Sequence, residues 1–232
     1  MGGRPARGGG RWVSVAPDRL GGWIEGFGER HGPVTATVVT GAGDGMAGEA
    51  VVLTAADGAV AECHVPFPPL APGGHGDPVR GLAGHAALPR RVGVVLVRLG
   101  GYAAGVFEGG SLVASKVGSR LVQGRTAAGG WSQRRFARRR ENQAGQAQDA
   151  AAETALRVLG PRLAELDAVV FGGDRRSVDA LRGDRRMAPV FALEAAPFLA
   201  VPDPRLAVLK ETPRTFLAVR IRVVDPVEGT AG

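Results

Sequence analysis

The stretch VGVVLVRLGGYAAGVFEGGSLVASKV, Val92 to Val117, decides the fold of this 232-residue chain. It divides at Gly100-Gly101 and at Gly109-Gly110 into three apolar runs of strand length. The runs are Val92 to Leu99, Tyr102 to Phe107 and Ser111 to Val117. Joins this short are typical of antiparallel neighbours, because a parallel pair needs a long crossover. The stretch therefore predicts an antiparallel meander.

The residues that follow the meander predict a layered α/β domain. From about Ser132 to Leu159 proline is absent and Ala, Gln, Glu and Arg dominate, which predicts one long helix. Its inward face is expected to hold Phe136, Gln143, Ala147, Ala150, Ala151, Thr154 and Val158. A buried strand is predicted at Leu166 to Gly173, a short helix within Asp174 to Arg182, and a further strand near Val190 to Leu193. Helices between strands indicate a mixed sheet with the long helix on one face.

The residues before the meander predict a smaller N-terminal α+β unit. Pro17 to Arg30 carries apolar residues at the spacing of an amphipathic helix, which are Leu20, Trp23, Ile24 and Phe27. Strands are predicted at Val34 to Thr40, Ala50 to Thr54 and Ala59 to Val65. Near the other end, Phe216 to Val224 alternates apolar and polar residues like a half-exposed strand, which could pair with either half of the chain.

Composition shifts along the chain suggest five segments. They are a disordered tail at 1–11, the N-terminal α+β unit at 12–66, a Pro/Gly-rich connector at 67–89, a catalytic domain at 90–195, and a C-terminal segment with one strand at 196–232. A loop that covers one domain would have the same composition as the connector.

Several function classes find little support in the sequence. The 44% hydrophobic content supports a globular core, and neither a signal peptide nor a membrane anchor is apparent, so a cytoplasmic protein is expected. Cys63 is the only cysteine, and neither a metal site nor a cofactor is predicted. Cys63, His64, His75 and His85 lack the context of a catalytic nucleophile. Asp174 and Asp184 are interpreted as helix caps or salt-bridged turns, and GAGDG, Gly41 to Gly45, as a turn.

The charge of the chain is concentrated in one place. QGRTAAGGWSQRRFARRR, Gln123 to Arg140, ends in five arginines within seven residues, and 109–140 holds eight Lys or Arg residues and no acid. Because the whole chain has a formal net charge of +7, the remainder is close to neutral. The arginines fall at the start of the predicted helix, where the helix dipole disfavours cations, so external phosphates are the expected partner. A solvated basic surface is the alternative interpretation.

With these residues the chain resembles a known family. A meander, a Gly-Gly loop with a glutamine, a long basic helix and a strand-helix-strand ending are similar to the central domain of archaeal and eukaryotic peptide-chain release factors. The greater similarity is to the release-factor-like tRNA hydrolases of ribosome quality control, in which the loop reads Gly-Gly-Ser-Gln. The whole chain resembles the actinobacterial branch of that group, which are peptidyl-tRNA hydrolases. Here the loop reads Gly129-Gly130-Trp131-Ser132-Gln133, one residue longer, and Arg120 to Ala144 carries the specific signal.

The resemblance implies the chemistry and the partners. Gln133 would orient a water and stabilise the oxyanion during hydrolysis of the peptidyl-tRNA ester, with Gly129, Gly130 and Ser132 forming the rest of the catalytic loop. The implied partners are the large ribosomal subunit, at its peptidyl transferase centre, and peptidyl-tRNA, without membrane or small-molecule cofactor. The predicted RNA-binding residues are Arg120, Arg125, Trp131, Arg134, Arg135, Arg138, Arg139 and Arg140. Two alternatives remain open: a non-catalytic RNA-binding or ribosome-binding module of the same fold, and a tRNA endonuclease that cuts near the CCA end.

Overall fold

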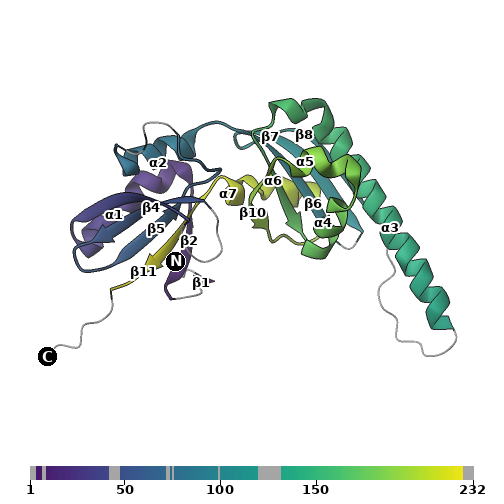
Figure 1. Cartoon of the computed structure of the whole chain (residues 1–232), viewed down its shortest axis with the longest axis horizontal. Helices are drawn as coiled ribbons and strands as arrows, with labels where there is room; N and C mark the ends of the chain where they lie inside the picture. Colours follow the sequence, from purple (N-terminus) through teal and green to yellow (C-terminus); the bar gives the residue numbers. More distant parts are fainter. Residues whose placement is uncertain are drawn as a thin grey trace. The chain divides into compact units, whose positions relative to one another are not determined.

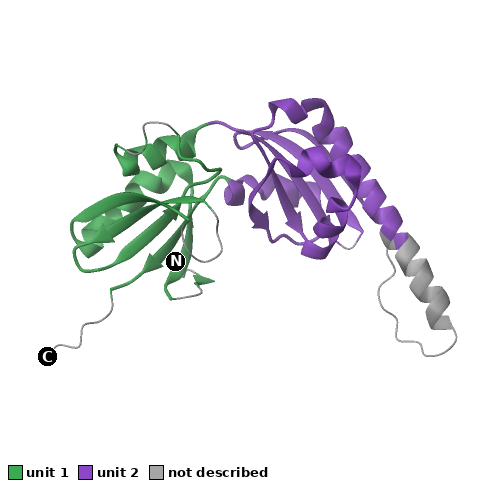
Figure 2. Cartoon of the chain, in the orientation of Figure 1, with its two compact units in different colours: residues 1–88, 217–232 green, residues 89–216 purple. Residues whose placement is uncertain are grey.

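The chain folds into two compact units (Figure 2). The structure, a computed structural model, describes residues 4–6, 9–41, 48–71, 74, 76–98, 100–119 and 132–226, and between 132 and 144 it describes only the side chain of residue 143. Unit 1 comprises Met1–Leu88 and Leu217–Gly232, and unit 2 comprises Pro89–Phe216.

Unit 1 is built on a six-stranded antiparallel sheet of order β1-β2-β11-β5-β4-β3 (Figure 1). The strands are β1 (Arg4–Pro5), β2 (Arg11–Val15), β3 (Val34–Thr40), β4 (Glu49–Ala55), β5 (Val60–His64) and β11 (Val219–Val224). β4 and β5 join across the turn at 56–59, where the Asp57 carboxylate accepts a hydrogen bond from the Ala59 N–H at 2.9 Å. That bond is the main reason the pKa of Asp57 is lowered.

The helices of unit 1 cover one face of this sheet. They are the 3-10 helix η1 (Pro17–Arg19), α1 (Leu20–His31) and α2 (Pro78–Ala87). The four apolar residues predicted to form the inward side of the first helix all join the core, with Leu20 and Phe27 fully buried. Gly32 ends α1 with φ of 86°, a left-handed conformation that favours glycine.

The C-terminal strand β11 lies in the interior of the unit 1 sheet, between β2 and β5. Val219, Ile221 and Val223 are buried, as their alternation with polar residues predicts. The sequence left open which half this strand would join, and the structure places it in the N-terminal unit. The predicted final segment at 196–232 is therefore divided between the two units, and it contains helices as well as a strand.

Three other expectations for unit 1 need correction. β2 was not predicted, because its apolar pattern is short and follows a Gly/Arg-rich stretch. Residues 1–11, predicted as a disordered tail, contribute β1 and the first residue of β2. The predicted connector at 67–89 contains α2, which is capped by the Asp77 side chain and packs Leu82 and Ala86 into the core. Proline at the first turn and glycines along the segment concealed this helix.

Unit 2 is built on a five-stranded mixed sheet of order β10-β9-β6-β7-β8. The strands are β6 (Arg91–Arg98), β7 (Gly101–Glu108), β8 (Ser111–Ser119), β9 (Ala168–Gly173) and β10 (Glu194–Leu199). β6, β7 and β8 form the predicted antiparallel meander, whereas β9 pairs in parallel with β6 and β10. The fold class is confirmed as mixed α/β.

Helices cover both faces of the unit 2 sheet (Figure 1). One face packs against α3 (Ser132–Leu159), α4 (Arg175–Arg182) and α5 (Ala188–Phe191), with the 3-10 helices η2 (Gly160–Glu165) and η3 (Arg185–Met187) beside them. The other face packs against α6 (Leu206–Glu211) and α7 (Pro213–Phe216), where the rings of Phe107 and Phe216 meet edge to face at 5.5 Å. The α3 bounds match the predicted helix at both ends.

The prediction of a strand near Val190 to Leu193 is wrong. Pro189 lies in the first turn of the short helix α5, and Val190 is buried against the core. The strand comes later, at β10, and contains Pro197. Proline is disfavoured inside sheets because it has no N–H to donate to a neighbouring strand. β10 tolerates Pro197 because it is an edge strand.

Candidate functional site

The predicted catalytic loop connects an edge strand to the start of a long helix. β8 is the last strand of the unit 2 sheet and ends at Ser119, and α3 begins at Ser132. Ser132 and Gln133 are thus the first two residues of α3. The loop residues Arg120, Arg125, Gly129, Gly130 and Trp131 lie outside the described part of the chain. Their roles stay predictions.

Five arginines of the predicted RNA-binding set are placed along the first turns of α3. The described backbone puts Arg134, Arg135, Arg138, Arg139 and Arg140 in the helix, and their side chains lie outside the described part of the structure. The structure brings these positions together with Gln133 on one continuous helix.

The opposite end of α3 anchors the helix to the sheet. Ala147, Ala151, Ala155 and Val158 recur every three or four residues and are all buried. Small alanine side chains allow the helix to lie close to β7, its main partner in the sheet. At 1.5 Å per residue, Arg138 lies about 14 Å along the helix axis from Ala147. The basic turns and the packed face therefore occupy different parts of one helix.

Beside this anchor, one tyrosine holds the strand that leads into the loop. Tyr102 on β7 pairs with Gly118 on β8, the penultimate residue of that strand. A Cβ at Gly118 would lie 2.5 Å from Cε2 of the tyrosine ring, so only glycine leaves room for the ring there. The ring also packs against the core cluster that contains the α3 alanines. Sequence analysis did not predict this pair, although a glycine inside a strand signals close approach of another group.

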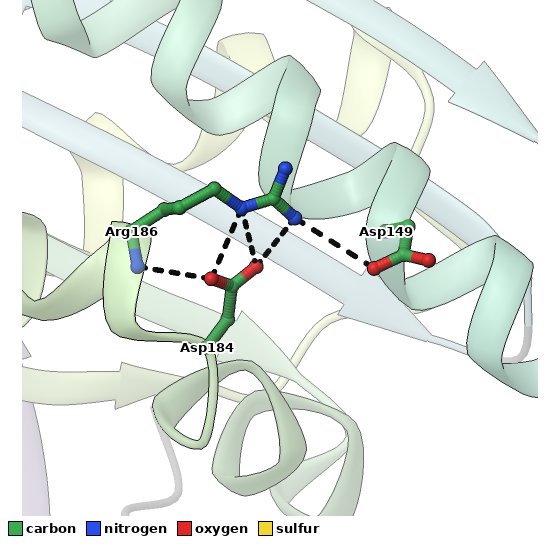
Figure 3. A network of polar contacts seen from close by, with 3 residues as sticks. All are labelled: Asp149, Asp184 and Arg186. Atoms are coloured by element: carbon green, nitrogen blue, oxygen red, sulfur yellow. Dashed lines mark hydrogen bonds and ion pairs between the residues drawn. The ribbon is translucent and has the colours of Figure 1, made fainter.

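A polar network links α3 to the loop after α4 (Figure 3). The Asp184 carboxylate accepts hydrogen bonds from the Arg186 side chain, at 2.6 Å from Nη2, and from the Arg186 backbone N–H at 2.9 Å. Arg186 Nη2 also lies 3.7 Å from Asp149 Oδ1 on α3. The hydrogen bond from the Arg186 side chain is the main cause of the lowered pKa of Asp184.

Arg186→Ala is expected to change the free energy of unfolding by less than about 1 kcal/mol. The Arg186 and Asp149 side chains are 50% and 73% exposed, and solvent screens ion pairs of that kind. The backbone bond to Asp184 survives the substitution. Urea unfolding of the variant, beside Arg185→Ala as an exposed neighbouring control, measures the difference. A decrease of more than about 2 kcal/mol would mean that this network holds α3 in place.

Among the described residues, the competing catalytic sites do not assemble, and His75 lies outside the described part of the chain. Cys63 is buried, and burial raises the pKa of its thiol to about 12, which makes it unreactive near neutral pH. The His85 ring accepts a hydrogen bond from Ala71 N–H at 3.0 Å and donates one to Pro66 O at 2.8 Å, a structural role. Asp174 and Asp184 act as the predicted caps.

Neither a metal-binding cluster nor a membrane-spanning helix is found in the described parts of the chain. Among the described residues, no group of three or more His, Cys, Asp or Glu side chains is placed to hold a metal ion. No helix in the described ranges is long and apolar enough to cross a membrane.

The comparison that decides the family concerns the same segment as the site. A family model described as Actinobacteria/chloroflexi VLRF1 release factor matches residues 90–222, which include β8, the loop and all of α3. The chain belongs to this release-factor family. The predicted resemblance to release-factor-like proteins is confirmed, and the family implies association with the ribosome.

Among solved structures, the chain is similar to an archaeal translation termination factor, aRF1. The identity is 15% and the TM-score 0.42, over 55% of this chain and 36% of the factor, so the matched part spans about a third of that protein. No curated protein sequence matches the chain.

Proposed function

We propose that this release-factor-family protein is a peptidyl-tRNA hydrolase, which acts in the cytoplasm on stalled ribosomes or free large subunits. The observation that carries the proposal is the family match across 90–222, combined with the position of Gln133 in the first turn of α3. The loop would enter the peptidyl transferase centre and release the nascent chain.

The proposed chemistry relies on positioning. A glutamine does not titrate, so Gln133 cannot serve as a general base. Its side-chain amide can orient the attacking water, and N–H groups of the loop and the first turn of α3 can stabilise the oxyanion that develops at the ester carbonyl. Gly129 and Gly130 would let the backbone approach RNA closely, and Ser132 would join the loop to Gln133 as the first residue of α3.

The proposed binding chemistry uses the other residues of the same segment. Arg120, Arg125 and the arginines at 134–140 would neutralise phosphates of ribosomal RNA or tRNA, and Trp131 would stack on a base. Since the packed half of α3 is separate from its basic turns, these residues can bind RNA without disturbing the core of unit 2.

Product analysis on isolated large subunits that carry peptidyl-tRNA tests the proposal. Ester hydrolysis gives free peptide and full-length tRNA. A tRNA endonuclease that cuts near the CCA end would leave the peptide on a short RNA fragment. A non-catalytic binding module would leave peptidyl-tRNA intact. Only the first product pattern agrees with the proposed function.

Charge removal from the basic turns is expected to weaken subunit binding and its salt dependence. In an Arg138→Ala, Arg139→Ala double variant, the slope of log affinity against log salt should fall by roughly 0.7 to 0.9 for each phosphate that the variant no longer neutralises. Subunit binding at several salt concentrations measures the slope. The control is Arg157→Ala, Arg162→Ala, which removes the same charge from exposed positions at the other end of α3 and in η2. Equal slopes for the two double variants would contradict a phosphate-binding role for the basic turns.

A further inference from the structure

The edges of the two sheets differ in how they are protected against pairing with another chain. An edge strand presents unpaired N–H and C=O groups, and proteins protect it by shortness, charge, proline or a bulge. In unit 1, the edge strand β1 consists only of Arg4 and Pro5. In unit 2, β8 carries Lys116 and a register shift, and β10 carries Pro197 and a register shift. Three of the four described sheet edges therefore have such protection.

The fourth edge, β3, has none of these features along its whole described length. Val34–Thr40 reads VTATVVT, which is seven residues without a charged side chain or a proline. Its pairing with β4 runs from Val34 to Thr40 without a register shift. Every residue except Ala36 is β-branched, which favours a strand. Because β3 pairs only with β4 among the described strands, its other side is an open template for a further strand.

The hydrogen bonds at both ends of β3 show which of its backbone groups point away from β4. Gly41 N–H donates to Gly48 O at 2.8 Å, and Ala56 N–H donates to Pro33 O at 3.0 Å. Hydrogen-bonded pairs of an antiparallel ladder occur at every second residue, so the odd-numbered residues of β3 bond to β4. Among the described residues, none donates to or accepts from the even-numbered backbone groups. These outward groups belong to Val34, Ala36, Val38 and Thr40.

β3 is complementary to itself in one register. If two copies pair antiparallel about a two-fold axis at Thr37, Val34 lies opposite Thr40 of the other copy, and Ala36 lies opposite Val38. These are the residues with outward groups, so every outward N–H and C=O of both copies gains a partner. Any other position of the two-fold axis leaves outward groups at one end of β3 unpaired.

The side chains of β3 also match in this register. Ala36 and Val38 pack against the core of unit 1, so pairing them places core-facing side chains beside each other. Thr37 is exposed on the opposite face and lies across from Thr37 of the second copy. Facing threonines stabilise an antiparallel pair, whereas like charges there would destabilise it. The register therefore satisfies the side chains as well as the backbone.

We propose that β3 is a dimerisation edge, at which a second copy of this chain adds by antiparallel β3–β3 pairing centred on Thr37. The pairing joins the two unit 1 sheets into one continuous sheet. Because the other edge of each sheet is the short strand β1, with its proline, assembly stops at a dimer. A seven-residue edge forms a small interface, so the dimer is expected to be weak and reversible. This pairing does not require the proposed hydrolase activity.

Disulfide trapping of cysteine variants tests the pairing and its register. In a non-hydrogen-bonded antiparallel pair the two Cα atoms are about 4.5 Å apart, a distance that a disulfide can span. Thr37→Cys therefore places two thiols opposite each other across the two-fold axis. In Thr35→Cys, a matched exposed position on the same face, the two thiols would be more than about 13 Å apart. The native Cys63 is buried, with the pKa of its thiol raised to about 12, and stays out of the reaction.

In a glutathione redox buffer, the full-length Thr37→Cys chain is expected to form a cross-linked dimer at least about tenfold faster than the Thr35→Cys chain. Non-reducing gel electrophoresis measures both rates. The Thr35→Cys, Val39→Cys double variant should also cross-link rapidly, because these two positions face each other in the proposed register.

Sedimentation velocity over a wide range of protein concentration measures dimerisation without a cross-link. The sedimentation coefficient of the wild type is expected to rise with concentration to that of a dimer and no further. Thr37→Lys places like charges opposite each other and should weaken dimerisation by about tenfold or more. Thr54→Lys, the same change at an exposed position of β4 on the same face, should leave it unchanged. Thermal unfolding verifies that both lysine variants fold, and the cysteine variants decide the matter if one does not.

Three results would overturn the inference. Equal cross-linking rates for Thr37→Cys and Thr35→Cys would mean that the chains meet only by random collision. A wild-type chain that stays monomeric at the highest concentration would mean that β3 does not pair with itself. Assembly beyond a dimer would contradict the closed two-fold register. None of these measurements involves peptide release, so each outcome leaves the hydrolase proposal intact.

Discussion

Gln133→Ala is expected to lower the single-turnover rate of peptide release by about 10² or more, by analogy with the removal of a positioned oxyanion donor. The substitution removes the amide that would orient the attacking water, while the neighbouring arginines keep their charge. Subunit affinity and its salt slope should therefore stay nearly unchanged. Release kinetics at saturating protein, beside a binding titration, measure the two quantities separately.

The matched control for this prediction is Gln146→Ala, the same chemical change at an exposed position of the same helix. Its release rate should equal that of the wild type. If Gln133→Ala weakened binding in step with activity, Gln133 would be an anchoring contact and the proposed mechanism would be wrong.

Gly173→Ala is expected to destabilise unit 2 by about 3 kcal/mol or more. Gly173 ends β9 with φ of 102°, a conformation that L side chains rarely adopt, and an added Cβ would lie 2.2 Å from the Val97 carbonyl oxygen. That oxygen accepts a hydrogen bond from Asp174 N–H at 2.9 Å, so it cannot move away without breaking the bond. Asp174 in turn caps α4, and the strain would spread to that helix.

Urea unfolding measures the effect, with Gly160→Ala as control. A Cβ at Gly160 meets no atom within 4 Å, so that substitution should leave stability within about 1 kcal/mol of the wild type. Similar unfolding midpoints for the two variants would mean that the close approach at Gly173 relaxes at little cost.

Much of unit 2 could be predicted because its signals are local. The glycine pairs that separate β6, β7 and β8 permit only short joins, and those joins impose antiparallel neighbours. The α3 bounds could be predicted because proline is absent and small apolar residues recur on one face. β10 was misplaced because a proline alone does not identify its element. Pro189 is accepted in the first turn of the helix α5, and Pro197 is accepted in β10 because β10 is an edge strand.

The arrangement of unit 1 depends on pairing between distant parts of the chain. β11 pairs with β2, which lies more than two hundred residues earlier in the sequence. The alternation of apolar and polar residues in β11 does not identify the strand with which it pairs. The same limit applies to the functional surfaces. The loop with Gln133 is recognisable as a continuous string, whereas the Tyr102–Gly118 pair exists only once the strands are in register.

Peptide release in heavy-oxygen water tests most directly whether water, positioned by the loop, attacks the ester. Large subunits that carry peptidyl-tRNA are treated with the wild-type chain in this solvent, and the released peptide is analysed by mass spectrometry. Attack at the ester carbonyl predicts one heavy oxygen in the carboxylate of the free peptide and none in the full-length tRNA. A peptide that leaves still attached to a nucleotide, or no release at all, would contradict the account.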